Sequence, residues 1–334
     1  MPTPAVQAPD TVLSLQGFGL RFKGQEASVV DGVDLDVARG EVLCIVGESG
    51  CGKSVTALAM MGLLPEGAAD LTGHFRFEDR SLDLAHETLD AGTRGGAMAM
   101  IFQEPMTSLN PSFRIGDQIG EAVHRHQGGT RAEARARALE MLRRVGLPSP
   151  VARLDQYPHQ MSGGQRQRVM IAMALANDPS VLIADEPTTA LDVTIQSQIL
   201  GLIRDLQREA GTATVLITHD LGVVAEIGDR VAVMYGGQVV ERGPVARLFD
   251  DPQHPYTIGL MESVPRLAGG RGRLATIPGT VPPIEAMPEG CRFRTRCAFA
   301  RADCATRPAL RDMGAGQAVA CHFAPLEAHL RVAS

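Results

Sequence analysis

The stretch Gly47–Ser54, with the sequence GESGCGKS, decides the fold of this chain. It matches the pattern G-x-x-x-x-G-K-[ST] of a phosphate-binding loop. The apolar run Val42–Val46 before it predicts a buried strand, and the run Lys53–Leu64 after it predicts a helix. A strand that stops at a glycine-rich turn and restarts as a helix points backbone N–H groups and the positive end of the helix dipole at one anion. The stretch therefore predicts a nucleoside triphosphate site rather than a Gly/Ser turn that binds nothing.

The residue types of this loop have separate tasks. Gly50 and Gly52 let the backbone approach the phosphates without a Cβ in the way. Lys53 is expected to reach the β- and γ-phosphates, and the Ser54 hydroxyl is a ligand for Mg²⁺. The residues expected to contact the nucleotide here are Gly47, Glu48, Ser49, Gly50, Cys51, Gly52, Lys53, Ser54 and Val55.

The composition is that of a globular protein large enough for one large domain and a smaller one, with 334 residues and 44% hydrophobic residues. The net charge of −6 gives no support for nucleic-acid binding, so we expect no such partner. No apolar run approaches the roughly 18–20 residues that cross a bilayer, and the N-terminus lacks a signal-peptide core. We therefore expect any membrane role to be peripheral, and a disordered tail over residues 1–10.

Short apolar segments ahead of the loop are typical of strands. Leu13–Leu15, Leu20–Phe22 and the alternating run Val33–Val37 predict an antiparallel sheet, to which Gly73–Phe77 adds a further strand. Such a sheet would place Phe22 near the nucleotide. Its ring either stacks on adenine or belongs to the core.

Two carboxylates follow the buried strand predicted for Val181–Ala184. The carboxyl end of a parallel strand faces the ligand crevice. We expect Asp185 to hold Mg²⁺ and Glu186 to orient and deprotonate the hydrolytic water.

Two other strands also end in polar side chains. Gln103 follows the strand predicted for Ala97–Phe102. Its amide could contact Mg²⁺ or the attacking water; the alternative is an amide at the surface that bonds only to solvent. His219 follows the strand predicted for Val215–Thr218 and is either a structural histidine or a γ-phosphate contact.

A second candidate anion site lies at Met161–Gln165 (MSGGQ), just before the helical run Arg166–Ala176. One nucleotide does not need two such loops from one chain, so we expect two chains to face each other. The residues of this second loop expected to contact nucleotide are Ser162, Gly163, Gly164 and Gln165.

Six features, in this order and at these spacings, resemble the ATPase subunits of ATP-binding cassette (ABC) transporters over about Leu13–Asp250. They are the phosphate loop, Gln103, MSGGQ, IADE with Pro187, Ala190-Leu191-Asp192, and His219. The one departure is Met161, where the family usually has leucine. The resemblance implies an α/β fold: an ABC-type P-loop NTPase with a RecA-like core, an antiparallel β subdomain and a helical subdomain at about 104–177.

The resemblance also implies a mechanism with a head-to-tail dimer. ATP binds between one chain's Gly47–Ser54 and the partner's Ser162–Gln165, and Asp192 communicates across the interface. The side chains expected to carry catalysis are Lys53, Gln103, Glu186 and His219, and those expected to hold Mg²⁺ are Ser54, Gln103 and Asp185. By the same resemblance, Phe22 is the adenine-stacking aromatic, and Gln103 reports to the membrane subunit.

A narrower resemblance spans nearly the whole chain. Glu104–Pro111 (EPMTSLNP), His254–Thr257 (HPYT) and the tail from Gly290 to His322 are similar to the dipeptide/oligopeptide/nickel importer branch. This implies an import ATPase on the cytoplasmic face of the membrane, docked under two permeases and paired as a heterodimer with a similar second ATPase. A peptide-binding protein outside the membrane would serve the same system.

Four cysteines in the tail are spaced C-x5-C-x6-C-x16-C, without the C-x2-C pairs of zinc knuckles. The tail has little apolar content, so a metal centre would supply folding energy. Ligation by four thiolates and the resemblance to some relatives favour a [4Fe–4S] cluster over Zn²⁺ or free structural thiols. Three interleaved arginines would screen the thiolates, face anionic lipid or form a solvated charge run. The four are Cys291, Cys297, Cys304 and Cys321; the arginines are Arg292, Arg294 and Arg296.

The expected organisation is an ABC ATPase domain over residues 11–250 and a small cysteine-containing C-terminal domain over residues 251–334. The expected function is ATP hydrolysis, with Mg²⁺, that energises uptake of dipeptides or oligopeptides. A nickel or glutathione importer is the alternative within transport. A soluble cassette ATPase that is not coupled to transport is the alternative from another class.

Overall fold

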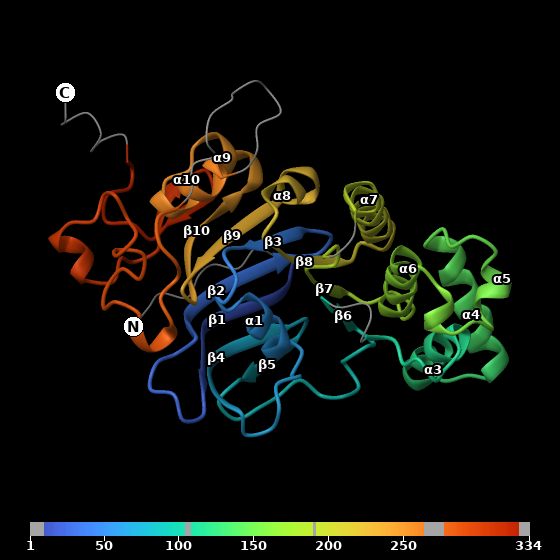
Figure 1. Ribbon diagram of the computed structural model, residues 1–334. Helices are drawn as coiled ribbons and strands as arrows, with labels where there is room; N and C mark the ends of the chain where they lie inside the picture. Colours follow the sequence, from blue (N-terminus) through green and yellow to red (C-terminus); the bar gives the residue numbers. More distant parts are fainter. Residues whose placement is uncertain (1–9, 104–107, 190–191, 264–276, 327–334) are drawn as a thin grey trace. The chain divides into compact units, whose positions relative to one another are not determined.

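The computed structural model describes residues 10–103, 108–189, 192–263 and 277–326 (Figure 1). They divide into two compact units. The helical unit holds Thr88–Leu216 and short pieces near the N-terminus, and the loop unit holds Ser14–Asp36, Val42–Glu87 and the chain from Ile217 onward. The predicted disordered tail (except residue 10), the first half of EPMTSLNP and Ala190-Leu191 lie outside the described residues. The predicted domain limits at 10/11 and 250/251 stay predictions.

A four-stranded sheet in the loop unit has the strand order β2-β1-β4-β5, and its strands β4 and β5 pair antiparallel. Its first strand is longer than the two short pieces that the sequence predicts. The strand continues through the exposed residues Gln16 and Gly17. Gly17 has a φ of 58°, and its N–H donates a hydrogen bond to the carboxylate of Asp34 at 2.6 Å. The strands are β1 (Thr11–Phe22), β2 (Val30–Ala38), β4 (Ala69–Phe77) and β5 (Arg80–Asp83).

A second sheet segment of the loop unit has the order β11-β12-β10-β9-β3. Strand β3 pairs in parallel with β9, whereas β9, β10, β12 and β11 pair antiparallel in turn. A hairpin turn at Gly236-Gly237 joins β9 to β10. The strands are β3 (Val42–Val46), β9 (Arg230–Tyr235), β10 (Gln238–Pro244), β11 (Arg311–Gly314) and β12 (Gln317–Val319).

The loop unit also contains four helices. The first ends at Met60, short of the predicted Leu64, because Gly62 adopts a φ of 59° and closes the helix with its N–H on the Ala59 carbonyl at 2.9 Å. The helices are α1 (Lys53–Met60), α8 (Leu221–Ile227), α9 (Val245–Asp250) and α10 (Pro255–Glu262). Two 3₁₀ turns follow, at Ile284–Ala286 and Ala302–Ala305.

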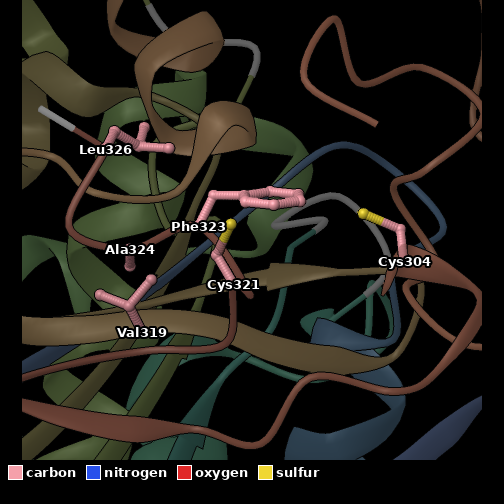
Figure 2. Close-up of a cluster of buried hydrophobic side chains, with 6 residues drawn as sticks. All are labelled: Cys304, Val319, Cys321, Phe323, Ala324 and Leu326. Atoms are coloured by element: carbon pink, nitrogen blue, oxygen red, sulfur yellow. The ribbon is translucent and has the colours of Figure 1, made fainter. Parts of the chain in front are cut away.

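The tail has an apolar core of its own (Figure 2). Ile258 of α10, Cys291 and Met313 pack against it. The expectation that the tail holds little apolar material is therefore wrong, because residues spread along the sequence converge in space. The buried members are Cys304, Val319, Cys321, Phe323, Ala324 and Leu326.

The helical unit contributes the sheet segment β8-β7-β6 and a group of helices drawn in green to yellow in Figure 1. Strands β6 and β7 are parallel, as their continuous apolar runs predict. The strands are β6 (Met98–Ile101), β7 (Val181–Asp185) and β8 (Ala213–Thr218), the last two residues of which belong to the loop unit. The helices are α3 (Ile115–Gln127), α4 (Arg131–Arg144), α5 (Pro150–Arg153), α6 (Gly163–Ala174) and α7 (Val193–Ala210), with a 3₁₀ turn at Pro158–Gln160.

Helix α4 illustrates how local sequence sets these elements. The Thr130 side chain accepts a hydrogen bond from the Glu133 N–H, and the Glu133 side chain accepts one from the Thr130 N–H, which together form a capping box. Ala134, Ala138 and Leu142 lie on its buried face. In the described residues, no helix combines the length and apolar character needed to span a bilayer.

Candidate nucleotide-binding site

The phosphate loop joins β3 to α1 in the loop unit, as the sequence predicts. Gly47 must be glycine, because a Cβ at this position would lie 2.2 Å from the Met234 carbonyl oxygen. Gly52 precedes α1 and has a φ of 99°, which residues other than glycine rarely adopt. The backbone is therefore shaped by glycine where the chain turns from strand to helix. Ser54, the expected Mg²⁺ ligand, is half-buried in the first turn of α1.

Lys53 is buried inside this loop, with 6% of its surface exposed. Its ammonium donates to the carbonyls of Gly47 at 2.8 Å and Glu48 at 3.0 Å, and lies 3.6 Å from the Cys51 sulfur. Burial raises the pKa of the Cys51 thiol, so that group stays neutral beside the cation. The loop thus holds one positive charge and several N–H dipoles together, which suits a polyphosphate.

In the helical unit, Asp185 ends β7 and is buried, and Glu186 follows it. The Glu186 Oε2 atom accepts hydrogen bonds from the Gln103 amide at 3.1 Å and from the Thr189 hydroxyl at 2.9 Å. Glu186 has a φ of 44°, an uncommon value for a residue other than glycine that tends to occur at functional sites. The structure therefore brings together Gln103 and Glu186, which the sequence separates by 83 positions.

His219 is exposed between β8 and α8, in the loop unit. Together with Gly47 and Glu48 it lines a pocket of about 320 Å³. This predicted residue thus lies beside the start of the phosphate loop. Phe22, at the end of β1, is half-buried and is not part of the fully buried core.

The second loop is the N-terminus of α6, in the helical unit. Ser162 is exposed and forms a capping box with Gln165: the Ser162 hydroxyl accepts the Gln165 N–H at 3.4 Å, and the Gln165 Oε1 atom accepts the Ser162 N–H at 3.2 Å. Gly163 opens the helix, and a Cβ on Gly164 would lie 3.1 Å from the Ile195 Cγ2 atom of α7. The lack of a side chain at Gly164 therefore lets the start of α6 approach α7 closely.

Two further contacts support this region. Asp192 is exposed and caps α7, where its carboxylate accepts the Ile195 N–H at 3.0 Å. Gln167, which the sequence analysis overlooked, is buried in α6 and donates to the carbonyl of Pro187, directly after Glu186. Its only sequence signal is an amide on the apolar face of a helix.

The four tail cysteines are free thiols. Among the described residues, no three Cys, His, Asp or Glu side chains are grouped as metal ligands, so the geometry gives the predicted [4Fe–4S] or Zn²⁺ centre no support. Burial, and to a lesser extent the neighbouring thiols, raise the pKa of Cys291 and bring that of Cys297 to about 11.

Two of the three interleaved arginines make intramolecular contacts instead of facing lipid, solvent or thiolate. Arg292 donates to the Gly236 carbonyl and pairs with Asp31 at 3.4 Å. Arg296 forms two hydrogen bonds with the carboxylate of Glu48 in the phosphate loop. The sequence analysis missed this role, because nothing local in the sequence links a tail arginine to a residue 248 positions away.

Comparisons with known proteins identify the family of this chain. The ABC transporter family profile matches residues 30–189, and that of the oligopeptide/dipeptide transporter C-terminal region matches residues 240–304. The chain is 51% identical over 291 residues to the dipeptide transport ATP-binding protein DppD of Bacillus subtilis, covering 86% of this chain and 87% of that protein. It is 47% identical to DppD of Escherichia coli, covering 95% and 97% of the two chains.

Solved structures show the same cassette fold. The ATP-binding cassette MJ0796, in a dimeric post-hydrolysis state bound to ADP and Pi, superposes with a TM-score of 0.60 at 29% identity, over 70% of this chain and 98% of that one. CbiO1 from Clostridium perfringens, part of the ABC transporter complex cbiONQ, gives 0.62 at 27% identity, over 72% and 92%. The chain therefore belongs to the ATP-binding, ATP-hydrolysing proteins of the ABC transporter family, in the branch that carries the oligopeptide/dipeptide transporter C-terminal region.

Proposed function

We propose that this chain is the ATPase subunit of an importer that takes up dipeptides or oligopeptides across the cytoplasmic membrane. The observation that carries the proposal is the extent of the similarity. It runs through the C-terminal region as well as the cassette, and the relatives named above are dipeptide transport ATP-binding proteins. A cassette fold alone would not indicate a peptide as the cargo.

Hydrolysis uses the residue roles expected from the sequence. Lys53 offsets the charge of the transferring phosphoryl group. Mg²⁺, when bound, would add positive charge there, and the residues proposed to hold it are Ser54, Gln103 and Asp185. Glu186 is the general base for the water, supported by its hydrogen bond from Gln103. His219 contacts the γ-phosphate, and Phe22 stacks on the adenine ring. The side chains of Ser54, Gln103 and Asp185 offer oxygen atoms, which are the ligands that Mg²⁺ prefers.

A second chain completes the nucleotide-binding site. The helix start at Ser162–Gln165 covers the partner's nucleotide, and Asp192 signals across the interface. The exposure of Ser162 and Asp192 supports these roles. The partner is a second, similar ATPase, which makes a heterodimer on the cytoplasmic face of the membrane. Two permeases and an extracytoplasmic peptide-binding protein complete the system.

The decisive experiment is reconstitution. This chain is co-expressed with the second ATPase and the two permeases from neighbouring genes, purified and placed in proteoliposomes with the binding protein. Uptake of labelled dipeptide that depends on ATP supports the proposal. Uptake of Ni²⁺ or glutathione instead, or purification in a purely cytosolic complex without permeases, contradicts it.

We also propose that the four tail cysteines hold a [4Fe–4S] cluster, because four cysteine thiolates are the usual ligands of such a cluster. Iron and acid-labile sulfide are quantified in protein purified without oxygen, alongside the Cys297→Ser variant. About four irons per chain, lost in the variant, would support the cluster. Stoichiometric Zn²⁺, or metal-free protein that is stable and active, would contradict it.

A further inference from the structure

Two side chains of the C-terminal region form hydrogen bonds with Glu48 of the phosphate loop. Its backbone N–H donates to the Tyr256 hydroxyl at 2.8 Å. Its carboxylate accepts hydrogen bonds from Arg296 Nη1 at 2.5 Å and Nη2 at 3.0 Å. Since the Glu48 carbonyl also accepts from the Lys53 ammonium, this residue links the C-terminal region to the phosphate-binding cation.

The Arg296 side chain is rigidly held, with 4% of its surface exposed. Its Nε atom donates to the Pro278 carbonyl at 2.8 Å and its Nη2 atom to the Gly279 carbonyl at 3.2 Å. The guanidinium also lies 5.7 Å from the ring centre of Tyr235. A two-pronged, buried contact of this kind is directional as well as strong, and lysine cannot reproduce it.

Tyr256 is equally constrained. It is fully buried, and its ring packs at 4.8 Å from that of Tyr235 and at 5.4 Å from that of Phe293, measured between centroids. Its own N–H donates to His254 Nδ1 at 3.0 Å, at the N-terminus of α10. The hydroxyl that receives the Glu48 N–H is therefore fixed in space.

Because the loop binds phosphate mainly through its backbone, its shape decides its affinity for ATP. We propose that Arg296 and Tyr256 are positioning residues for ATP, which hold the phosphate loop through Glu48 and couple it to the cysteine-bearing turn Cys291–Cys297. This rests on the proposed function only in that the loop is the ATP site. Arg296 lies within that turn, so by linkage ATP binding must in return stabilise the turn.

The first test uses steady-state kinetics of the assembled transporter. We expect Arg296→Gln to raise the KM for ATP about tenfold, within the usual range of coupling between sites, and to leave kcat within about twofold. Arg296→Lys should restore part of the loss, and Tyr256→Phe, which removes only the hydroxyl, should shift KM in the same direction. Arg294→Gln is the matched control, since no side-chain hydrogen bond or ion pair of Arg294 occurs among the described residues.

A double-variant cycle separates positioning from general damage. If Arg296 acts through Glu48, the pair Arg296→Gln and Glu48→Gln should raise KM no more than the larger single change. Additive effects on KM would overturn the proposal. So would an Arg296→Gln protein that melts at a lower temperature with KM unchanged, since that result marks a purely structural role. If Arg296→Gln does not fold, Tyr256→Phe and Glu48→Gln carry the same test.

The second test measures hydrogen exchange of the backbone amides at 291–297 with and without ATP. Wild type and Arg294→Gln should show slower exchange with ATP, and Arg296→Gln should lose that protection at saturating nucleotide. Protection that persists in Arg296→Gln, or is absent in wild type, would contradict the coupling. A wild-type complex that hydrolyses ATP without moving peptide would count against the proposed function and leave this inference standing.

Discussion

At the scale of single residues, Glu186 combines an uncommon backbone conformation with two side-chain hydrogen bonds, from Gln103 and Thr189. Glutamine at this position can still accept both bonds through its amide oxygen, but it cannot take a proton from water. We therefore expect Glu186→Gln to lower the ATP hydrolysis rate by at least about 100-fold, the usual contribution of a general base. ATP binding should stay within about twofold of wild type.

Phosphate release and binding of a fluorescent ATP analogue measure the two quantities separately in the assembled transporter. The variant should also accumulate in its ATP-bound closed form. Hydrolysis at the wild-type rate would show that the base has been assigned to the wrong carboxylate.

A second residue-scale prediction concerns His254, which is fully buried and accepts the Tyr256 N–H through Nδ1. Burial lowers its pKa from 6.5 to about 3. Between these values the unfolded chain binds a proton that the folded chain excludes. The stability that the neutral imidazole contributes is thus complete above about pH 6.5 and falls as the pH drops, by up to ~1.4 kcal/mol per pH unit.

Asparagine can cap α10 through its side-chain oxygen without titrating in this range. Denaturant unfolding of wild type and His254→Asn at about pH 7 and pH 5 should therefore show a stability difference that shrinks at the lower pH. The comparison must use the pair of proteins, because the pKa of the nearby Glu241 is raised by burial and its protonation acts in the opposite sense. A difference that does not change with pH would mean that His254 is not buried in its neutral form.

The residue scale also shows where sequence reasoning stops. The order of Gly47, Gly52, Lys53 and Ser54 is fixed by local chemistry, so the phosphate loop could be found from its pattern. The pairing of Arg296 with Glu48 depends on the path of the chain over 248 positions, and an arginine beside two cysteines offers more obvious local explanations. Contacts of this kind follow from tertiary structure alone.

At the scale of elements, the N-terminus of α6 has two tasks that one substitution can separate. The Ser162 hydroxyl caps the helix, and the proposed function also places it against the partner's nucleotide. Aspartate caps a helix about as well as serine, whereas alanine costs ~1 kcal/mol. We expect Ser162→Asp to leave the stability of this chain within about 0.5 kcal/mol and to reduce ATP hydrolysis by the transporter strongly, because its carboxylate would repel the phosphates.

Ser162→Asn is the matched neutral control, since it keeps the cap without the charge. Thermal or denaturant unfolding gives the stability, and phosphate release gives the activity. Equal activity of the Asp and Asn variants would mean that Ser162 faces no phosphate.

Most elements could be predicted because their signals are local. The alternation of Val33–Val37 and the apolar run Val42–Val46 gave strands that the structure confirms. The end of α1 was missed because Gly62 terminates it while apolar residues continue. The capping box at Ser162 was overlooked although S-x-x-Q is visible in the sequence, because the two glycines between suggested only an anion site.

At the scale of the whole chain, the tail was the part least predictable from sequence. Its loops and cysteines suggested a region dependent on metal, but β12 pairs with β10 and the tail forms an apolar core. These features arise from residues far apart in sequence, such as Ile258 and Cys321, which no window of periodicity joins. Backbone pairing thus joins β12 of the tail to β10, which lies next to β9. The carbonyl of Met234 in β9 in turn leaves no room for a side chain at Gly47.

The last prediction concerns the proposed head-to-tail dimer. Each ATP site takes its phosphate loop from one chain and, from the other chain, the serine that corresponds to Ser162, which is called the signature serine below. Lys53→Ala here and substitution of the signature serine in the second ATPase then damage the same site. Lys53→Ala and Ser162→Asp, both in this chain, damage different sites. We therefore expect the cross-chain pair to hydrolyse ATP no more slowly than the worse single variant, because changes within one functional unit are not additive.

The same-chain pair should lose the activity that either single variant retains, since it impairs both sites of the dimer. Phosphate release by the four-subunit complex, purified with each combination, measures both cases, and equal subunit stoichiometry on gels controls for assembly. The opposite pattern, with the same-chain pair equal to a single variant and the cross-chain pair far slower, would mean that each chain builds its own complete site. In that case Gly47–Ser54 and Ser162–Gln165 of one chain would bind the same nucleotide, and ATP could not act as the link between the two ATPases.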